Sequence, residues 1–450
     1  MLKRNSQNKS GFVQMVDIES LVPSNHLVRK VLNVISFDFI YDLVETLYSE
    51  DIGRPSIDPV ILFKIVFIQY LFNIRSMRET IEQINMNIAY RYFLGFDFTE
   101  PIPHFSTFSQ NYIRRYKDTT IFEEIFNTIL YQVISHGLVK TDNIFVDSTH
   151  VKAYANKRKI TNEVLNATTT IYMDKLETEI NEERKKENKK EIELYPEKKE
   201  IISLTDPECG MFHKGEKERQ LAYSNQVISD ENGWVLASSI VSGNTNDGKG
   251  GQEIIIEYVE KHSDELIGVV MDSGYDVPII LEELLNRGVL PVVPYHKPKG
   301  IKLRDGDGNV VIRISKDSYE YDGAKNIYVC PQGKKLGYSG TNTLGYKEYK
   351  SKKKDCLNCP LKHKCTGTNT KTITRHFYEK SKKYAQEIRN SEYGREIYKK
   401  RKTSIERVFA NSKMNHCLGF TFLRGLRKNE NRSFVIFAMQ NLKKLATIAG

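Results

Sequence analysis

The 450-residue sequence predicts an α/β protein with a helical N-terminal region and a cysteine-rich insertion. Apolar residues recur at helical spacing in the first part of the chain, and short apolar runs that end in carboxylates follow Gly137. Four of the six cysteines lie between residues 297 and 390. Single domains usually contain about 100–200 residues, so a chain of this length should form several packed units. A hydrophobic fraction of 40% excludes a disordered chain.

Residues 1–136 are predicted to form a helical DNA-binding domain. Apolar residues from Val60 to Leu71 follow a helical rhythm, and Asp58 with the proline after it is typical of a helix start. A second amphipathic helix is expected from Ser76 to Tyr92, with Gly95 just beyond its end. Small helical bundles hold DNA in some proteins and serve only as scaffolds in others.

Residues 137–296 are predicted to form the first part of a sheet-containing core. Apolar runs typical of strands are 143–147, 233–241, 266–272 and 289–293. A helix is expected at 277–286, between the last two runs, which gives a β-α-β unit with a buried parallel strand pair. A charged insertion at about 157–205 interrupts this core, and its stretch from 182 to 200 has seven residues of each sign and so no net charge.

The positive charge of the chain is local. The net charge is +10, and the window from Arg375 to Arg432 alone has 16 basic and 6 acidic residues. Such a segment suits the phosphates of nucleic acid, although a solvated basic face remains the alternative. We expect no membrane-spanning helix and no secretory signal, and hence a cytoplasmic protein.

The insertion at 297–390 is rich in Gly, Lys and Asp and shows no evident core of its own. Four thiols within 36 residues suit a structural Zn²⁺ site, with His363 as a possible substitute for one of them: Cys330, Cys356, Cys359 and Cys365. The alternative is a set of reduced, partly buried thiols. Residues 391–450 are predicted to return to the core.

Three carboxylates are candidates for chemistry. Asp147 and Asp272 each end a predicted strand, where an aspartate is by itself more often a turn former or a helix cap. Glu406 lies beside the apolar stripe of a basic helix, and its simplest alternative role is an ion pair with Lys402.

Together these residues resemble the acidic triad of bacterial insertion-sequence DDE transposases. The three motifs are FVDSTHVKA, VVMDSGYD and YKKRKTSIERVFANSK, which contain Asp147, Asp272 and Glu406. The family's Tyr-Arg-Glu-Lys signature around the glutamate is matched by Tyr398, Arg401, Glu406 and Lys413. Arg401 lies one residue too far from the glutamate, and Lys402 stands at the expected place, so either residue can fill the arginine's role.

The resemblance covers about residues 12–445 and implies a ribonuclease-H-like mixed sheet. It places the first aspartate on the first strand, the second after the fourth strand, and the glutamate on a following helix. It further implies Mg²⁺ or Mn²⁺ held by the three carboxylates, because close carboxylates repel each other unless cations separate them. Residues implied to contact DNA are Tyr398, Arg401, Lys402, Arg407 and Lys413.

The implied function is two-metal phosphoryl transfer that cleaves and joins DNA at terminal inverted repeats and at target DNA. A homodimer on DNA in the bacterial nucleoid is expected. Two alternatives stay open: a DNA-binding regulator or inhibitor without catalysis, and a domesticated nuclease of the same fold. Other residues that could contact the substrate, or only shape a strand edge or a turn, are His150, Lys152, Tyr154, Asn244 and Asp247.

Overall fold

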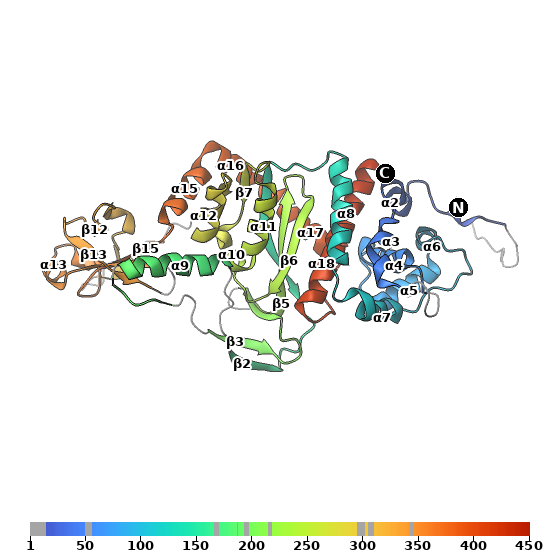
Figure 1. Cartoon of the computed structure of the whole chain (residues 1–450), viewed down its shortest axis with the longest axis horizontal. Coiled ribbons are helices and arrows are strands. Elements are labelled where there is room, and N and C mark those ends of the chain that lie inside the picture. Colours follow the sequence, from blue (N-terminus) through green and yellow to red (C-terminus); the bar gives the residue numbers. More distant parts are fainter. Residues whose placement is uncertain are drawn as a thin grey trace, which may run out of the picture.

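The computed structural model describes residues 15–49, 56–165, 171–186, 188–192, 198–214, 218–294, 302–304, 310–342 and 346–450. The molecule is elongated (Figure 1), with the N-terminal helices at one end, a mixed sheet in the middle and a small separate sheet at the other end. Helix α9 (Ile171–Lys186) extends from the middle toward the small sheet.

The N-terminal region is helical, as predicted. Its helices are α1 (Ile18–Leu21), α2 (Leu27–Val34), α3 (Phe39–Val44), α4 (Pro59–Leu71), α5 (Met77–Met86), α6 (Ile88–Leu94), α7 (Ser106–Asn111) and α8 (Ile121–Ser135). Asp58 caps α4 by accepting from the backbone N of Val60 at 2.7 Å. The prediction of one helix over Ser76–Tyr92 is wrong. The backbone of Asn87 is extended, and its side chain caps a new helix, α6.

The central sheet has the ribonuclease-H-like topology that the sequence predicts. Its core strands are β1 (Asn143–Lys152), β5 (Glu218–Asp230), β6 (Val235–Ser242), β7 (Gly268–Val270) and β8 (Leu290–Val292), in the order β6-β5-β1-β7-β8. β5 runs antiparallel to its neighbours, while β7 and β8 are parallel to β1. Helix α12 (Pro278–Asn286) connects β7 to β8, which confirms the predicted β-α-β unit. The charged insertion contributes β2 (Ile160–Leu165) and β3 (Lys198–Ser203), and β4 (Gly210–Lys214), which follows it, joins them to β5.

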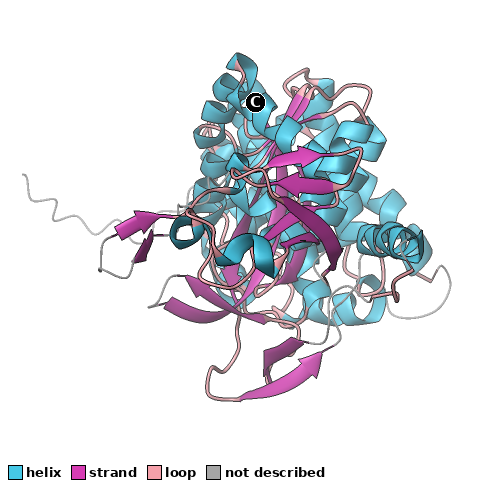
Figure 2. Cartoon of the chain, turned by 90° about the vertical axis from the view of Figure 1, so that its left-hand side faces the viewer, coloured by secondary structure: helices cyan, strands magenta, loops and turns pink. Residues whose placement is uncertain are grey.

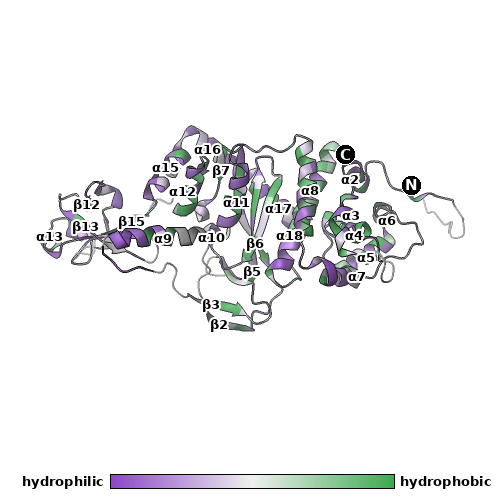
Figure 3. Ribbon diagram, in the orientation of Figure 1, coloured by the Kyte–Doolittle hydropathy of each residue, from purple (hydrophilic) through white to green (hydrophobic). Residues whose placement is uncertain are grey.

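Helices cover the sheet on both sides (Figures 1 and 2). Helices α10 (Asp247–Gly250) and α11 (Gln252–His262) follow β6, and the C-terminal helix α18 (Leu426–Ala449) packs against β6, α2 and α8. One continuous apolar core therefore joins the N-terminal helices to the sheet. Strand β6 is mostly hydrophobic, whereas much of α9 is hydrophilic (Figure 3). Within the described ranges, no helix combines the length and apolar character needed to cross a membrane.

The cysteine-rich insertion is a small folded unit. Its sheet consists of β11 (Glu320–Asp322), β12 (Ile327–Val329), β13 (Lys335–Thr341), β14 (Tyr346–Ser351) and β15 (Thr372–His376). A hairpin of β9 (Lys302–Arg304) and β10 (Val310–Ile312) and the short helices α13 (Lys353–Leu357) and α14 (Lys362–Cys365) complete it. The prediction that the insertion has no core of its own is wrong. Five buried residues form a small hydrophobic core: Tyr319, Tyr328, Leu336, Tyr349 and Ile373. The chain then returns through α15 (Glu379–Asn390), α16 (Glu392–Lys399) and α17 (Ile405–Asn415).

Candidate active site

Strand register brings Asp147 and Asp272 to the same edge of the sheet. β1 and β7 are parallel neighbours, and Phe145 pairs with Val270. Each aspartate lies two residues beyond its member of this pair, so the two carboxylates leave the sheet side by side. Asp272 also accepts from the backbone N of Gly274 at 2.7 Å, which fixes its orientation. Both side chains are half-buried.

Asp147 lies beside a buried cation. Nη2 of Arg401 donates to Asp147 Oδ2 at 2.5 Å, and Arg401 is only 5% exposed. Burial raises the pKa of Asp147 to about 6; Arg401 opposes this shift, while Asp272 and Asp247 add to it. Nη1 of Arg401 is buried and has no hydrogen-bond partner among the described residues. The carboxylate edge therefore holds excess negative charge that one guanidinium only partly offsets.

Asp247, at the start of α10, is a third carboxylate at this edge. Its Oδ1 accepts from Ser148 Oγ at 2.5 Å. A Cβ placed on Gly274 would lie 2.9 Å from Asp247 Oδ2 and 3.0 Å from Asp272 Oδ1, so those oxygens lie near each other across the glycine. The sequence suggested Asp247 mainly as a turn residue. Its one local signal was its place in the loop directly after the strand 233–241, while Ser148 gave none.

Glu406 is placed differently. Ile405, Val408 and Phe409 are buried and turn α17 toward the sheet, where the helix packs against β1 and β5. Glu406 lies in the first turn of α17 with its side chain exposed. It does not join the aspartates: across the described ranges, no three His, Cys, Asp or Glu side chains are grouped closely enough to hold a metal ion.

The basic residues predicted to contact DNA divide into two sets. Lys402, Arg407 and Lys413 are exposed. Arg401 is buried at Asp147 and does not lie on the surface. Arg401, rather than Lys402, thus lies at the carboxylates. Tyr398 is half-buried, with the guanidinium carbon of Arg401 5.7 Å from its ring centre.

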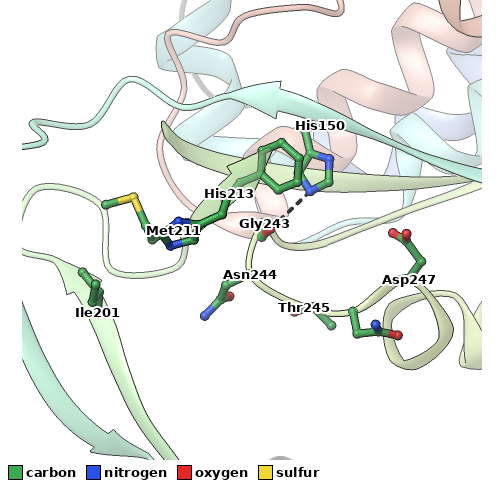
Figure 4. Close-up of a pocket in the computed structure, with 10 residues that line it drawn as sticks. His150, Ile201, Met211, His213, Gly243, Asn244, Thr245 and Asp247 are labelled. Atoms are coloured by element: carbon green, nitrogen blue, oxygen red, sulfur yellow. Dashed lines mark hydrogen bonds between the residues drawn. The ribbon is translucent and has the colours of Figure 1, made fainter. Parts of the chain in front are cut away.

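A pocket opens next to the carboxylate edge and shares Asp247 with it (Figure 4). Its volume is about 430 Å³, and its polar lining includes His150, Asn244 and Asp247. The His150 ring stacks on Phe212 with 3.5 Å between ring centres. Nε2 of His150 lies 3.2 Å from the backbone O of Gly243, which orients the imidazole. The pocket therefore joins a rigid aromatic wall to the acidic edge.

The cysteines of the insertion remain free thiols. Cys365 Sγ lies 2.9 Å from the Tyr319 hydroxyl. Burial raises the pKa of Tyr319, and Cys365, Cys330 and Cys356 near its hydroxyl raise it further. Of the four predicted ligands, Cys365 contacts this hydroxyl, and among the described residues no three of the thiols are grouped closely enough to hold a metal ion. Cys359 lies on the turn after Cys356, and its backbone N donates to the Cys356 carbonyl at 3.5 Å.

The sheet order and the single antiparallel strand next to β1 define a ribonuclease-H-like fold, with Asp147 in the middle of β1 and Asp272 two residues after β7. Two family profiles match the sequence: a transposase domain (DUF772) over residues 16–114 and a transposase DDE domain over residues 329–446. The chain is a DDE-type transposase, as the motifs predicted. The second profile spans Glu406, whereas Asp147 and Asp272 lie between the two matched ranges.

Two solved structures share distant similarity with the chain. A piggyBac transposase synaptic complex with hairpin DNA is 8% identical, with a TM-score of 0.30, and the match covers 94% of this chain and 72% of that one. A pre-cleavage Mos1 transpososome is 9% identical, with a TM-score of 0.17, and the match covers 60% of this chain and 78% of that one. No curated protein matches the sequence.

Proposed function

We propose that this transposase cleaves and joins DNA strands at the ends of an insertion sequence, with Asp147, Asp272 and Glu406 as its catalytic carboxylates. The observation that carries the proposal is that Asp147 and Asp272 each lie two residues beyond the paired Phe145 and Val270 of adjacent parallel strands, close enough for Asp272 to raise the pKa of Asp147. Water would be the attacking group in strand nicking, and a DNA 3′-hydroxyl would attack in strand transfer.

The donor set fits Mg²⁺ or Mn²⁺. All its ligands are carboxylate oxygens, which hard divalent cations prefer. Burial raises the pKa of Asp147, which shows that a negative charge at this position is costly without a cation. The guanidinium of Arg401 forms an ion pair with this carboxylate. Bound ions would activate the attacking oxygen and stabilise the leaving one. Asp147, Asp272 and Glu406 would hold these ions.

The exposed cations beside this edge would position the DNA. Lys402, Arg407 and Lys413 lie on or next to α17, whose apolar face packs against β1. Contacts of this kind fix the register of the duplex without reading its sequence. A homodimer would hold the two ends of the element together.

The test is cleavage of a duplex that carries the inverted repeats flanking the coding region. We expect Mg²⁺-dependent nicking followed by joining to target DNA, and no reaction in EDTA. Release of linear product without joining would replace the proposal by a domesticated nuclease. Tight binding without cleavage would replace it by a DNA-binding regulator.

A structural Zn²⁺ site is the second part of the proposal. Cys330 and Cys365 pack against the small tyrosine-rich core, and Cys356 lies on α13 beside it in the same insertion. Thiolates are the preferred ligands of tetrahedral structural zinc, and Cys359 would supply the fourth. Such a site would tie helices α13 and α14 to the strand end at Cys330.

We expect one zinc ion per chain when the protein is purified without chelators and measured by elemental analysis. The variants Cys356→Ser and Cys359→Ser should lose it, and the melting temperature should fall. Cys209→Ser and Cys417→Ser are the matched controls, because these thiols lie outside the insertion. Absence of zinc from the wild-type protein would reject the site.

A further inference from the structure

An aromatic cluster lies exposed near the far end of β1. Its rings belong to Tyr154, Phe420 and Phe422, with centres 4.8 Å apart for the two phenylalanines and 5.8 Å apart for Tyr154 and Phe422. Tyr154 is 50% exposed, Phe422 57%, and the adjoining Leu423 38%. Single exposed apolar side chains are ordinary, but contiguous ones mark interaction sites.

The backbone beneath these rings is firmly held. Lys152 N donates to the Gly419 carbonyl and Thr421 N donates to the Lys152 carbonyl, both at 3.1 Å, so this segment pairs with the end of β1. Arg432 Nη2 donates to the Phe420 carbonyl at 2.8 Å. Tyr223 Oη accepts from Gly425 N at 2.9 Å. The rings therefore sit on an ordered support rather than on a loose loop tip.

The segment that carries Phe420 and Phe422 has an excess of positive charge, although Asp206 and Glu208 accept hydrogen bonds from its backbone at Gly425 and Leu426. The segment from Lys413 to Arg432 has five basic residues and one acidic residue. The guanidinium of Arg424 lies 5.3 Å from the centre of the Tyr154 ring, and its Nε donates to the Tyr154 carbonyl. Lys152 and Lys428, which lie close in sequence to Tyr154 and Arg424, have exposed side chains. Exposed aromatic rings among cations favour a polyanion that also offers flat apolar faces, and single-stranded nucleic acid has both.

β1 connects this cluster to the candidate active site. Lys152 lies five residues beyond Asp147 on the same strand, a separation of about 17 Å at about 3.3 Å per residue. Duplex DNA covers this distance in about five base pairs. We propose that Tyr154, Phe420 and Phe422 form a stacking platform for unpaired DNA bases about five nucleotides from the scissile phosphate. This inference rests on the proposed function.

The test measures binding of the full-length chain to a fluorescein-labelled oligothymidylate of about 20 nucleotides and to a duplex of equal length. We expect Tyr154→Ala/Phe422→Ala to lose about tenfold or more in affinity for the single strand and to keep its duplex affinity. Phe422→Trp should retain binding. Tyr131→Ala is the matched control, because Tyr131 is 68% exposed on α8.

Unchanged single-strand affinity in the double variant would overturn the platform. A loss of self-association without a loss of DNA affinity would also overturn it, and would instead assign the rings to an interface between two copies of the chain. If the wild-type chain nicks DNA and the ring variants bind single-stranded DNA normally, the stacking platform is rejected and the proposed function is kept. If single-strand binding needs the rings but the wild-type chain never cleaves DNA, the proposed function is rejected and the platform is kept.

Discussion

Replacing Asp147 by Asn is expected to reduce DNA strand cleavage by at least about a thousandfold while leaving DNA affinity within about twofold. The substitution keeps the size of the side chain and removes the negative charge that a divalent cation needs. The measurement is single-turnover nicking of an end-bearing duplex, with binding measured separately in EDTA. Asp272→Asn should behave in the same way, because Asp272 and Asp147 lie at equivalent positions, each two residues beyond the paired Phe145 and Val270.

Two controls separate lost chemistry from lost folding. Asp142→Asn alters an exposed aspartate just before β1 and should leave cleavage unchanged. Breaking the buried pair with Arg401 can itself cost about 3–5 kcal/mol, so the variant's unfolding transition must be recorded. Asp147→Asn/Asp272→Asn should be no slower than either single variant, because groups that act as a unit are not additive. A fully active single variant would remove that aspartate from the catalytic set.

The strands could be predicted because they depend on local pattern. The prediction that Asp147 ends its strand is wrong, because β1 continues to Lys152 in its ladder with β5. Short apolar runs ending in Asp147 and Asp272 gave the parallel pair, and parallel strands bring their carboxyl ends together whatever lies between them. The role of Asp247 was not predictable, because it depends on the close approach of α10 to Gly274. The same residue in isolation is an ordinary turn former.

The position of Arg401 also depended on structure that the spacing did not reveal. Residues Lys400–Lys402 form a 3₁₀ turn, and α17 begins only at Ile405. A 3₁₀ turn has about 3.0 residues per turn against 3.6 in an α-helix, so side-chain directions change phase there. The signature spacing therefore left Arg401 and Lys402 both open, and the 3₁₀ turn is what buries Arg401 and leaves Lys402 exposed.

The insertion was misjudged for a different reason. Its composition is rich in Gly and Lys, and its core is made chiefly of tyrosines spread over several short strands. Tyrosine buries a large apolar ring and keeps a polar hydroxyl that needs a partner. The Tyr319 hydroxyl finds that partner in Cys365. A count of aliphatic residues cannot detect such a core.

Replacing Glu406 by Gln is expected to reduce strand cleavage by about a thousandfold or more with almost no effect on folding. Its side chain is exposed in the first turn of α17, so the free energy of unfolding should change by less than about 0.5 kcal/mol. The helix itself is fixed against β1 by Ile405, Val408 and Phe409. The measurement is the same nicking assay at saturating Mg²⁺, and Glu396→Gln, an exposed glutamate on α16, is the matched control.

This experiment also decides which residue is the third carboxylate. Asp247 lies near Asp272 across Gly274, whereas Glu406 forms no metal-sized group with the two proposed catalytic aspartates among the described residues. We expect Asp247→Asn to slow cleavage less than Glu406→Gln, because Asp247 accepts from Ser148 and serves mainly to hold the strand end in place. An inactive Asp247→Asn beside an active Glu406→Gln would mean that the third carboxylate comes from α10. The exposed glutamate on α17 would then take no part in catalysis.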